Sequence, residues 1–255
     1  MKLHKKVVVI TGGSKGLGKA LAQAFKIEDA HVVISSNDKD SLESTAKELS
    51  SDSYIADVTS FEDLKKLSKY VLDKYHKIDI WINNAGIQIT PSRMEDVDID
   101  KLHNLFNINF FGYFYGCQIA LSIMKKQSSG TIININSTAG LEGKPLISAY
   151  SSSKFAIRGL TESIRKENQD NNIKILGIFP GGIQTDIYKE RYPENFKEYM
   201  TTDYAVDKVM RNLKLDSPAL DLIIRRPKAL IPKINAILLL SSILFCIAHQ
   251  YLFLL

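Results

Sequence analysis

Seven short apolar runs, each with the length of a β-strand, constrain the fold of this chain more than any other feature. They are VVVIT (7–11), HVVIS (31–35), SYIAD (53–57), IDIWIN (78–83), GTIININ (130–136), IKILGIF (173–179) and LDLII (core 221–224). The runs are rich in Val and Ile and nearly continuous, as in strands that are covered on both faces. Segments with helical spacing of apolar residues lie between them. This alternation predicts the α/β class, with a doubly wound parallel sheet and right-handed crossovers.

The composition excludes disorder and several classes of function. Of the 255 residues, 45% are apolar and 24% are charged, which is enough apolar material for a large core. Lys and Arg exceed Asp and Glu by 33 to 28, but the cations are spread along the chain, so no nucleic-acid partner is expected. The excess suits anionic partners such as a phosphorylated cofactor or an acidic lipid surface. Cys117 and Cys246 lie far apart and the five histidines lack metal-ligand spacing, so we predict a reducing compartment and no metal.

The last segment of the chain differs from the rest. Residues 234–255 carry no formally charged side chain and follow the cations Arg225, Arg226, Lys228 and Lys233. About 20 apolar residues span a bilayer core, and flanking cations favour the cytoplasmic side. We therefore predict a single dinucleotide-binding and catalytic domain over 1–230, cytoplasmic and attached to a membrane by a hydrophobic C-terminal helix over 231–255. The alternative is a helix packed on protein, which the polar residues within the segment favour.

A glycine-rich loop, TGGSKGLG, follows the first strand and leads into a helical segment. Gly12, Gly16 and Gly18 are spaced as TGxxxGxG. Glycines let the backbone approach a pyrophosphate, which the free N–H groups and the dipole of the next helix stabilise. The loop is not the GxxxxGK[ST] of phosphate-transferring enzymes, because Lys15 precedes Gly16. It favours a nucleotide site at the carboxyl edge of the sheet.

Polar residues follow two further strands, as NNAG (83–86) and NSTAG (136–140), and the next helical segment places Tyr150 four positions before Lys154. Positions i and i+4 share a helix face. A cation beside a phenol favours the phenolate and lowers a tyrosine pKa that is otherwise about 10, which yields a proton donor and acceptor near neutrality. The structural alternative is a half-buried aromatic ring beside a solvated lysine.

Six motifs, in this order and at this spacing, resemble those of the short-chain dehydrogenase/reductase family. They are TGGSKGLG, NNAG at 83, NFFG at 109, Ser137 thirteen residues before Tyr150, YSSSK, and PGGIQT at 180. The resemblance extends from residue 7 to about residue 225. It implies a Rossmann-like fold and an NAD(P)(H)-dependent oxidoreductase that interconverts a ketone or aldehyde and an alcohol.

The resemblance also implies roles for individual residues. Tyr150 would exchange a proton with the substrate oxygen, while Lys154 would lower the Tyr150 pKa and hold the nicotinamide ribose. Ser137 would hydrogen-bond the carbonyl or alcohol, and Asn109 would continue a proton relay through water to Lys154. The residues expected to contact the cofactor are Gly12, Ser14, Lys15, Gly16, Leu17, Gly18, Ser36, Asn37, Asp57, Val58, Asn84, Ala85, Gly86, Tyr150, Lys154, Pro180, Gly181, Ile183 and Thr185.

Charge at the end of the second strand bears on the choice of cofactor. A carboxylate there would accept from the ribose hydroxyls of NAD and repel the extra phosphate of NADP, but this sequence has Ser36 and Asn37. Lys15 stands where similar NADP-dependent members often carry a basic residue; Asp38, and the lack of an arginine at 37, argue the other way. We favour NADP(H) over NAD(H). Asp57 is expected at the adenine edge or, alternatively, as the cap of the next helix.

The segment DIYKERYPENFKEYMTTD (186–203) covers the substrate in this family's arrangement. Its apolar residues would form a lid, although a loop packed on its own scaffold is the alternative; they are Tyr188, Tyr192, Phe196, Tyr199 and Met200. The lid and the tail together favour a lipophilic substrate, such as a sterol, retinoid, long-chain acyl compound or ketosphingoid base.

Two other functions stay open from the sequence. One is a soluble oligomeric reductase of a small carbonyl compound, and the other is a non-catalytic NADP-binding regulator, against which the intact Ser137, Tyr150 and Lys154 set argues. Members of the family commonly pair through two long helices, near 101–127 and 150–168 here. The resemblance therefore implies a homodimer or tetramer.

Overall fold

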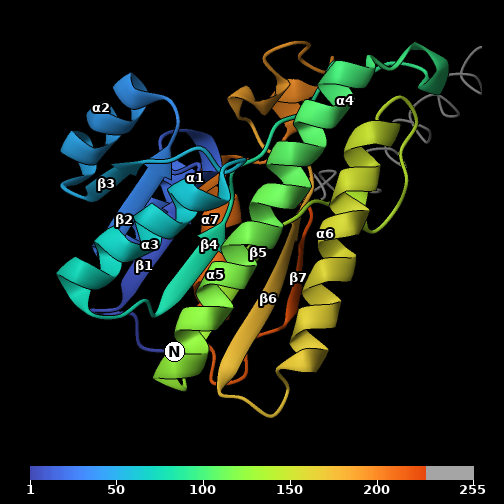
Figure 1. Ribbon diagram of the computed structural model, residues 1–255. Helices are drawn as coiled ribbons and strands as arrows, with labels where there is room; N and C mark the ends of the chain where they lie inside the picture. Colours follow the sequence, from blue (N-terminus) through green and yellow to red (C-terminus); the bar gives the residue numbers. More distant parts are fainter. Residues whose placement is uncertain (228–255) are drawn as a thin grey trace, which may run out of the picture. The chain divides into compact units, whose positions relative to one another are not determined.

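The computed structural model describes residues 1–227, and its compact unit Met1–Arg225 is built on a seven-stranded sheet with helices on both faces (Figure 1). The strand order is β3-β2-β1-β4-β5-β6-β7, and every pairing is parallel. The strands are β1 Val7–Thr11, β2 His31–Ser36, β3 Asp52–Ile55, β4 Ile80–Asn83, β5 Gly130–Ile135, β6 Ile173–Pro180 and β7 Asp221–Ile224. The predicted α/β class with a doubly wound parallel sheet is confirmed.

Side chains of each strand alternate between two hydrophobic cores, as the period of two in a β-strand requires. Val8 and Ile10 of β1 pack in one core with α1 and α7, whereas Val7 and Val9 pack in the other with α3 and α5. The helices are α1 Gly16–Ile27, α2 Lys39–Leu49, α3 Phe61–Tyr75, α4 Ile99–Phe106, α5 Gly112–Gln127, α6 Ser148–Glu167 and α7 Thr202–Lys214. Burial on both faces explains why the strands read as continuous apolar runs.

The long helix expected near 101–127 contains one irregular turn. A π-helical turn, Asn107–Phe111, separates α4 from α5, and the fully buried Asn109 lies within it. Such turns are rare and often occur at functional sites.

The sheet changes winding direction between β1 and β4. β1 leads to β2 and β3 on one side, and the chain then returns to place β4 on the other side of β1. In open parallel sheets a crevice forms at this switch, beyond the carboxyl ends of the strands. The glycine-rich loop follows β1 and the NNAG loop follows β4, so both end at the crevice.

Within residues 1–227 no helix combines the length and the apolar character needed to cross a membrane. The hydrophobic helix predicted over 231–255 lies outside the described residues. It stays a prediction, as does the boundary at residue 230.

A buried polar network ties β4 and β5 to the helices next to the crevice. Trp81 Nε1 donates to Asn83 Oδ1 (2.8 Å), Asn83 Nδ2 donates to Asn134 Oδ1 (2.8 Å), and Asn134 Nδ2 donates to Thr161 Oγ1 (2.9 Å). Gly116 of α5 lies against this network, because a Cβ built there would sit 2.1 Å from Asn83 Oδ1. The network requires a residue without a side chain at position 116.

We expect Gly116→Ala to destabilise the protein by about 2 kcal/mol, since the added methyl group would displace the buried amide of Asn83. Gly159→Ala is the matched control: Gly159 is also helical, but a Cβ there meets nothing within 4 Å. That substitution should leave stability unchanged or raise it by up to about 1 kcal/mol, because alanine is the better helix former. Urea unfolding midpoints measure both effects, and equal shifts in the two variants would contradict this account.

Candidate active site

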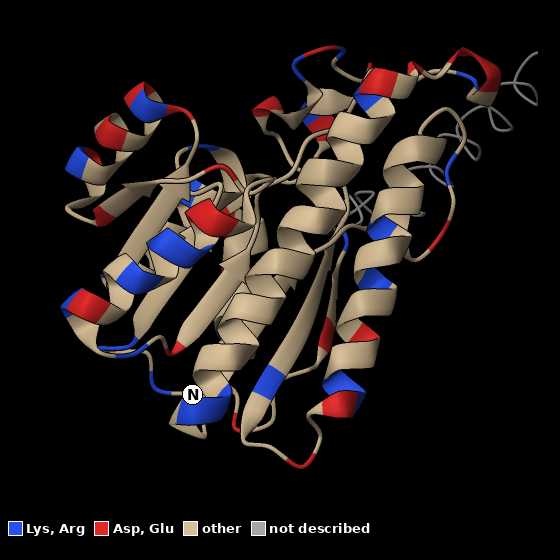
Figure 2. Ribbon diagram, viewed as in Figure 1, with Lys and Arg blue, Asp and Glu red and all other residues tan. Residues whose placement is uncertain are grey.

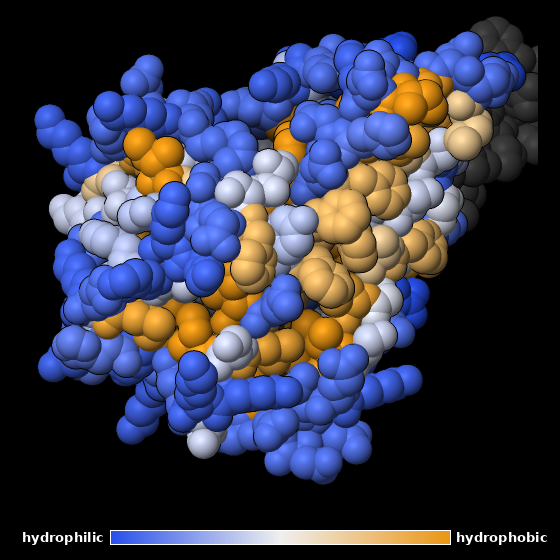
Figure 3. Space-filling model, in the orientation of Figure 1, coloured by the Kyte–Doolittle hydropathy of each residue, from blue (hydrophilic) through white to orange (hydrophobic). Residues whose placement is uncertain are grey.

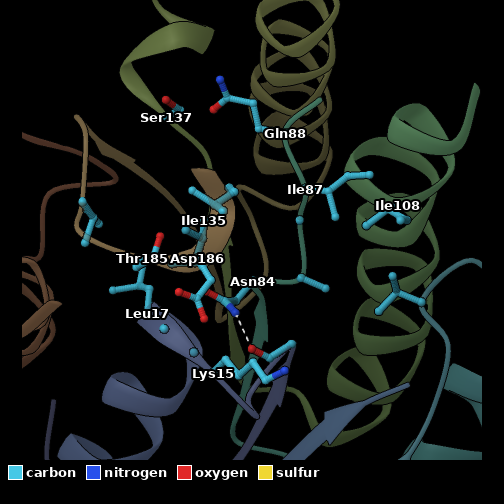
Figure 4. A pocket seen from close by; sticks show the side chains of 18 of the residues that line it. Lys15, Leu17, Asn84, Ile87, Gln88, Ile108, Ile135, Ser137, Thr185 and Asp186 are labelled. Carbon is cyan, nitrogen blue, oxygen red and sulfur yellow. Dashed lines mark hydrogen bonds between the residues drawn. The ribbon is translucent and has the colours of Figure 1, made fainter. Parts of the chain in front are cut away.

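A cavity of about 590 Å³ opens beyond the carboxyl ends of β1, β4, β5 and β6. All residues that the sequence assigned to the cofactor line it except Ser14, and Ser137, Tyr150 and Lys154 line it too. In Figure 4, Lys15 and Leu17 lie toward one end of the cavity, and Ser137 and Gln88 lie toward the opposite end. The fold therefore brings nearly the whole predicted set of residues to one place.

The glycine-rich loop has the features of a phosphate cradle. Gly12 and Gly16 have positive φ values of 62° and 52°, and a Cβ on Gly18 would lie 2.2 Å from the Gly12 carbonyl oxygen. The first turn of α1 has no side-chain cap and no acidic residue. Its backbone N–H groups and helix dipole can therefore receive an anion. The residues present fit a dinucleotide pyrophosphate.

Asn84 fastens the NNAG loop to this cradle. Its Nδ2 donates to the carbonyl oxygens of Thr11 (3.0 Å) and Gly12 (2.9 Å), and its backbone N–H donates to Thr11 Oγ1 (3.1 Å). A Cβ on Gly12 would lie 2.7 Å from Ala85 Cα. The two loops thus touch backbone to backbone, which fixes the floor of the cavity.

Hydrogen bonds fix the position of Ser137 and leave its hydroxyl group able to act as a donor. Its Oγ accepts from Ala139 N (3.1 Å), and its backbone N–H donates to Asn136 Oδ1 (2.9 Å). Because the Oγ accepts from the backbone, its own hydrogen can be donated to another oxygen. The Tyr150 hydroxyl is such a partner, since hydrogen bonding to Ser137 acts to lower the Tyr150 pKa.

Tyr150 and Lys154 lie one turn apart on α6 and are 9% and 4% exposed. Lys154 Nζ donates to the Ile135 carbonyl oxygen (3.2 Å) and lies 5.6 Å from the centre of the Tyr150 ring and 5.3 Å from that of Tyr113. The phenol and the amine therefore share one face, as the i, i+4 spacing predicted.

The predicted lowering of the Tyr150 pKa is wrong for this structure. Burial raises the pKa of Tyr150 to about 12, and hydrogen bonding to Ser137 counters this only in part. Burial also lowers the pKa of Lys154 to about 7, so this side chain is only partly charged near neutrality. Desolvation disfavours both charged forms, and it outweighs the attraction that the sequence pattern implied.

Asn109 does not line the cavity. Its Oδ1 accepts from Ile87 N and its Nδ2 donates to Ile87 O, both at 2.9 Å, and Nδ2 also reaches Ser153 Oγ at 3.3 Å. The side chain thus fastens the loop after NNAG to the π turn. The relay role implied by the resemblance stays a proposal.

At the end of the cavity near Lys15, two residues that were expected to contact the cofactor form hydrogen bonds within the protein. Ser14 is 7% exposed and its hydroxyl donates to Ser36 Oγ (3.1 Å), behind the cavity wall. Asp57 lines the cavity, and its Oδ1 accepts from Thr59 N (2.9 Å) and Thr59 Oγ1 (2.8 Å). Asp57 therefore makes an Asx-type turn, while the N-cap of α3 is Ser60, not Asp57.

The segment expected to form a lid holds an aromatic cluster. The Tyr188 ring lies 5.9 Å from Phe196 and 5.4 Å from Tyr199, and Tyr192 lies 4.8 Å from Phe196. Of the five predicted lid residues, Tyr188 lines the cavity, and Met200 packs in the core instead. Glu190 joins this segment to the β4–α4 loop, because its Oε2 accepts from Thr90 N (2.9 Å) and Thr90 Oγ1 (2.5 Å).

Sequence reasoning missed the wall of the cavity next to Ser137 and Tyr150. This wall includes residues from the loop after NNAG and from the helical segment before NFFG: Ile87, Gln88, Asn104 and Ile108. Figure 4 shows Ile87 and Ile108 projecting into the cavity from these two elements. Ile87 and Gln88 directly follow the strand-end motif NNAG, and this position could have identified them as cavity residues. Asn104 and Ile108 have i, i+4 spacing, which could have indicated that they share one helix face.

Comparison with known proteins agrees with the site. Residues 6–195 match the family described as short chain dehydrogenase. The chain belongs to this family. A 3-oxoacyl-[acyl-carrier-protein] reductase, FabG, of Thermotoga maritima is 35% identical over 205 residues, which cover 78% of this chain and 82% of that protein. This short-chain dehydrogenase is thus an oxidoreductase.

Two solved structures have the same fold. ElxO with NADP bound has a TM-score of 0.79 and 30% identity, and the match covers 87% of this chain and 97% of that one. The 3-ketoacyl-(acyl-carrier-protein) reductase of Brucella melitensis, complexed with NADH, has a TM-score of 0.82 over 88% of this chain and 97% of that one. At 22% identity the latter shows the fold alone.

Burial of Lys154 predicts a pH-dependent stability. Its pKa of about 7 lies below the ordinary 10.5, so between these values the unfolded chain holds a proton that the folded protein lacks. Stability of the wild type should therefore rise with pH across this window. Lys154→Met removes the desolvation penalty of the buried amine and should be more stable than the wild type by about 5 kcal/mol near pH 6, with the difference falling to about 1 kcal/mol at pH 10. Urea unfolding of both proteins at several pH values tests this, and a difference independent of pH would contradict it.

Proposed function

We propose that this short-chain dehydrogenase uses NADPH to reduce a lipophilic ketone or aldehyde to an alcohol. The observation that carries the proposal is a single cavity lined at one end by the uncapped first turn of α1 and Lys15, and at the other by Ser137, Tyr150 and Lys154. When bound, the reduced nicotinamide supplies a hydride. The side chains described below supply binding, orientation and the proton.

Tyr150 donates the proton. Its hydroxyl is protonated at neutral pH, and burial, which raises its pKa to about 12, keeps it so, and it can therefore give a proton to an oxygen that becomes an alkoxide. Ser137 can donate its hydroxyl hydrogen, which is otherwise directed to Tyr150, to the same oxygen. Lys154, with a pKa of about 7, can take up and release a proton near neutrality and is placed to replace the proton that Tyr150 loses. Asn109 would order water for this transfer.

The preference for NADP(H) rests on charge. Lys15, Ser36 and Asn37 line the cavity beyond the ends of β1 and β2, and none of them is acidic. A cation beside two neutral hydrogen-bonding residues suits a ribose that carries a phosphate. Lys15 also pairs with Asp38 (2.7 Å), which acts against this preference. Asp57, the carboxylate that lines the cavity nearby, is engaged with Thr59. This arrangement supports NADP(H) over NAD(H).

The proposal of a lipophilic substrate is based on the residues that form the cavity wall next to Tyr150. Ile87, Ile108, Ile187 and Tyr188 line the cavity there. Apolar side chains with a few polar groups are typical of a site for a largely apolar ligand. The membrane attachment predicted for residues 231–255 would bring such a substrate near, but that segment lies outside the described residues.

We expect Tyr150→Phe to lower kcat for carbonyl reduction at least about 100-fold, because the substrate oxygen loses its proton donor. Binding of NADPH should persist, since the cradle is untouched. NADPH consumption with a panel of lipophilic ketones measures the first effect, and calorimetric titration measures the second. Turnover by Tyr150→Phe equal to that of the wild type would contradict the assigned role. If the wild type binds NADPH but turns over no substrate, the non-catalytic regulator is favoured.

We further propose that the protein forms a homodimer through α5 and α6. Phe111, Phe114 and Phe155 are each 42–43% exposed, and apolar residues gather over these helices in Figure 3. α5 carries charge only in its last turn, as Figure 2 shows. Contiguous exposed apolar surface of this kind marks interaction sites.

We expect Phe114→Glu to convert the oligomer to a monomer, because a charge would be buried in each half of the interface. Ile27→Glu is the control, since Ile27 is 76% exposed at the end of α1 and lies on another helix. Light scattering of the purified proteins gives the mass. A wild type that is already monomeric, or a monomer from both variants alike, would overturn the assigned interface.

A further inference from the structure

The carbonyl oxygen of Ile135, the last residue of β5, accepts hydrogen bonds from two side chains. Lys154 Nζ lies 3.2 Å from this oxygen, and the Tyr113 hydroxyl lies 2.7 Å from it. A carbonyl oxygen can only accept, so both groups donate to it. The distance of 2.7 Å is typical of an O–H···O bond, whereas 3.2 Å is at the upper end of the range for N–H···O bonds. Tyr113 therefore makes the stronger of the two bonds.

Tyr113 lies beside the Lys154 amine but does not line the cavity. It belongs to the first turn of α5 and is 1% exposed. Its ring faces the amine, with Lys154 Nζ 5.3 Å from the ring centre. Burial raises the pKa of Tyr113 well above its ordinary value, so the hydroxyl stays protonated and remains a donor. Any effect of Tyr113 on the reaction therefore acts through another residue.

The groups that face Lys154 Nζ from the neighbouring elements are neutral near pH 7. Tyr150 on α6 has its ring centre 5.6 Å away, and burial raises its pKa to about 12. A Cβ on Gly86, in the loop after β4, would lie 3.9 Å from Nζ and 3.3 Å from the amide oxygen of Asn109 in the π turn. Cys117, one turn beyond Tyr113 on α5, has a pKa that burial raises to about 12. These elements bring no charge to the amine.

The charged groups of the site lie on other segments. Burial is the cause of the lowered Lys154 pKa, and no carboxylate in residues 1–227 contributes to it. α4 packs against α6, but its titratable side chains are exposed: Asp100, Lys101 and His103. The other charged residues that line the cavity are Lys15, Asp57, Asp186, Lys189 and Glu190. The Ile135 carbonyl is thus the polar group that most directly controls the proton on Lys154.

The two parts of the Tyr113 side chain act on the amine in opposite directions. The face of an aromatic ring attracts a cation, so the ring helps to hold the ammonium beside it. The hydroxyl hydrogen carries a partial positive charge and lies at the same carbonyl oxygen, so it repels the ammonium. A hydrogen bond to the charged form raises the pKa of an amine. Sharing the oxygen with Tyr113 weakens this stabilisation of the charged Lys154.

We propose that Tyr113 is a positioning residue of the proposed reductase: its ring fixes the Lys154 amine, while its hydroxyl shares the Ile135 carbonyl and so keeps that oxygen from retaining the proton of the amine. The proton then stays available for transfer toward Tyr150. The inference rests on the proposed roles of Tyr150 and Lys154 in ketone reduction.

Tyr113→Phe tests the proposal, because it removes the hydroxyl and keeps the ring and its packing. The Ile135 carbonyl would then accept from Lys154 alone, so the pKa of Lys154 should rise by about 0.5 to 1 pH unit, or about three- to ten-fold in proton affinity. NMR titration of the protein without cofactor, labelled with ¹³C at lysine Cε, measures this pKa. An ordinary lysine titrates near about 10.4, so a signal that moves near neutrality and is lost in Lys154→Met belongs to Lys154.

The pH dependence of reduction gives a second readout. Lys154 must carry a proton to replace the one that Tyr150 loses, so kcat should fall as the pH rises through the Lys154 pKa. In Tyr113→Phe this alkaline limb should move to higher pH by the same amount. The KM for the ketone should stay unchanged, because Tyr113 does not line the cavity. A residue that only supports packing would lower kcat at every pH and leave the midpoint in place.

Tyr75→Phe is the matched control. It also removes a hydrogen-bonded hydroxyl, which donates to Asp52, but Tyr75 ends α3 and does not line the cavity. This substitution should leave both the Lys154 titration and the alkaline limb of kcat unchanged.

An unchanged or lowered Lys154 pKa in Tyr113→Phe would overturn the role of Tyr113, and so would an equal rise in Tyr75→Phe. A wild-type Lys154 that titrates near the ordinary value of about 10.4 would also overturn it, since the hydroxyl would then release no proton for transfer. If the wild type reduces no ketone, the proposed function fails, but the NMR titration still decides whether Tyr113 controls the proton on Lys154.

Discussion

The change of winding direction between β1 and β4 is the constraint on which the rest of the structure depends. It leaves the carboxyl ends of these two strands without a crossover helix between them, so the loops that follow must meet each other. They meet so closely that a Cβ on Gly12 would collide with the Ala85 backbone, and one on Gly18 would collide with the Asn84 side chain. The sheet thus places the proposed phosphate cradle beside the NNAG loop, and β5 and α6 add Ser137 and Tyr150 to the same cavity.

The chemistry of the site has a cost in stability. A lysine and a tyrosine that would be fully solvated in the unfolded chain are removed from water on α6, and the amine is left with a carbonyl oxygen and two aromatic rings as neighbours. Desolvation brings the pKa of Lys154 to about 7 and that of Tyr150 to about 12. The phenol is thus kept as an acid, and the amine becomes a group that exchanges protons near neutrality. The large alternating cores on both faces of the sheet offset this cost.

The strands of the sheet could be predicted from the sequence because each strand corresponds to one local run of apolar residues. Each strand begins and ends within two residues of its apolar run, because most positions of β1, β2, β4, β5 and β6 are buried and carry apolar side chains. The cavity residues expected to contact the cofactor were also predictable, apart from Ser14, because strand-end motifs converge in a parallel sheet. The wall of Ile87, Gln88, Asn104 and Ile108 was not predicted. The π turn at Asn107–Phe111 was not, and neither was the sign of the Tyr150 pKa shift. Both depend on what surrounds a residue in three dimensions, as does the contact between Lys15 and Asp38.

The central claim is that one cavity holds a dinucleotide from the first turn of α1 to the Tyr150–Lys154 pair. A crystal structure of the protein with bound NADP⁺ tests it most directly. The account predicts that the pyrophosphate lies at the backbone N–H groups of Gly16–Gly18, and that the nicotinamide ribose lies within hydrogen-bond distance of Lys154 Nζ. A nucleotide bound elsewhere, or one whose nicotinamide points away from Tyr150, would contradict it.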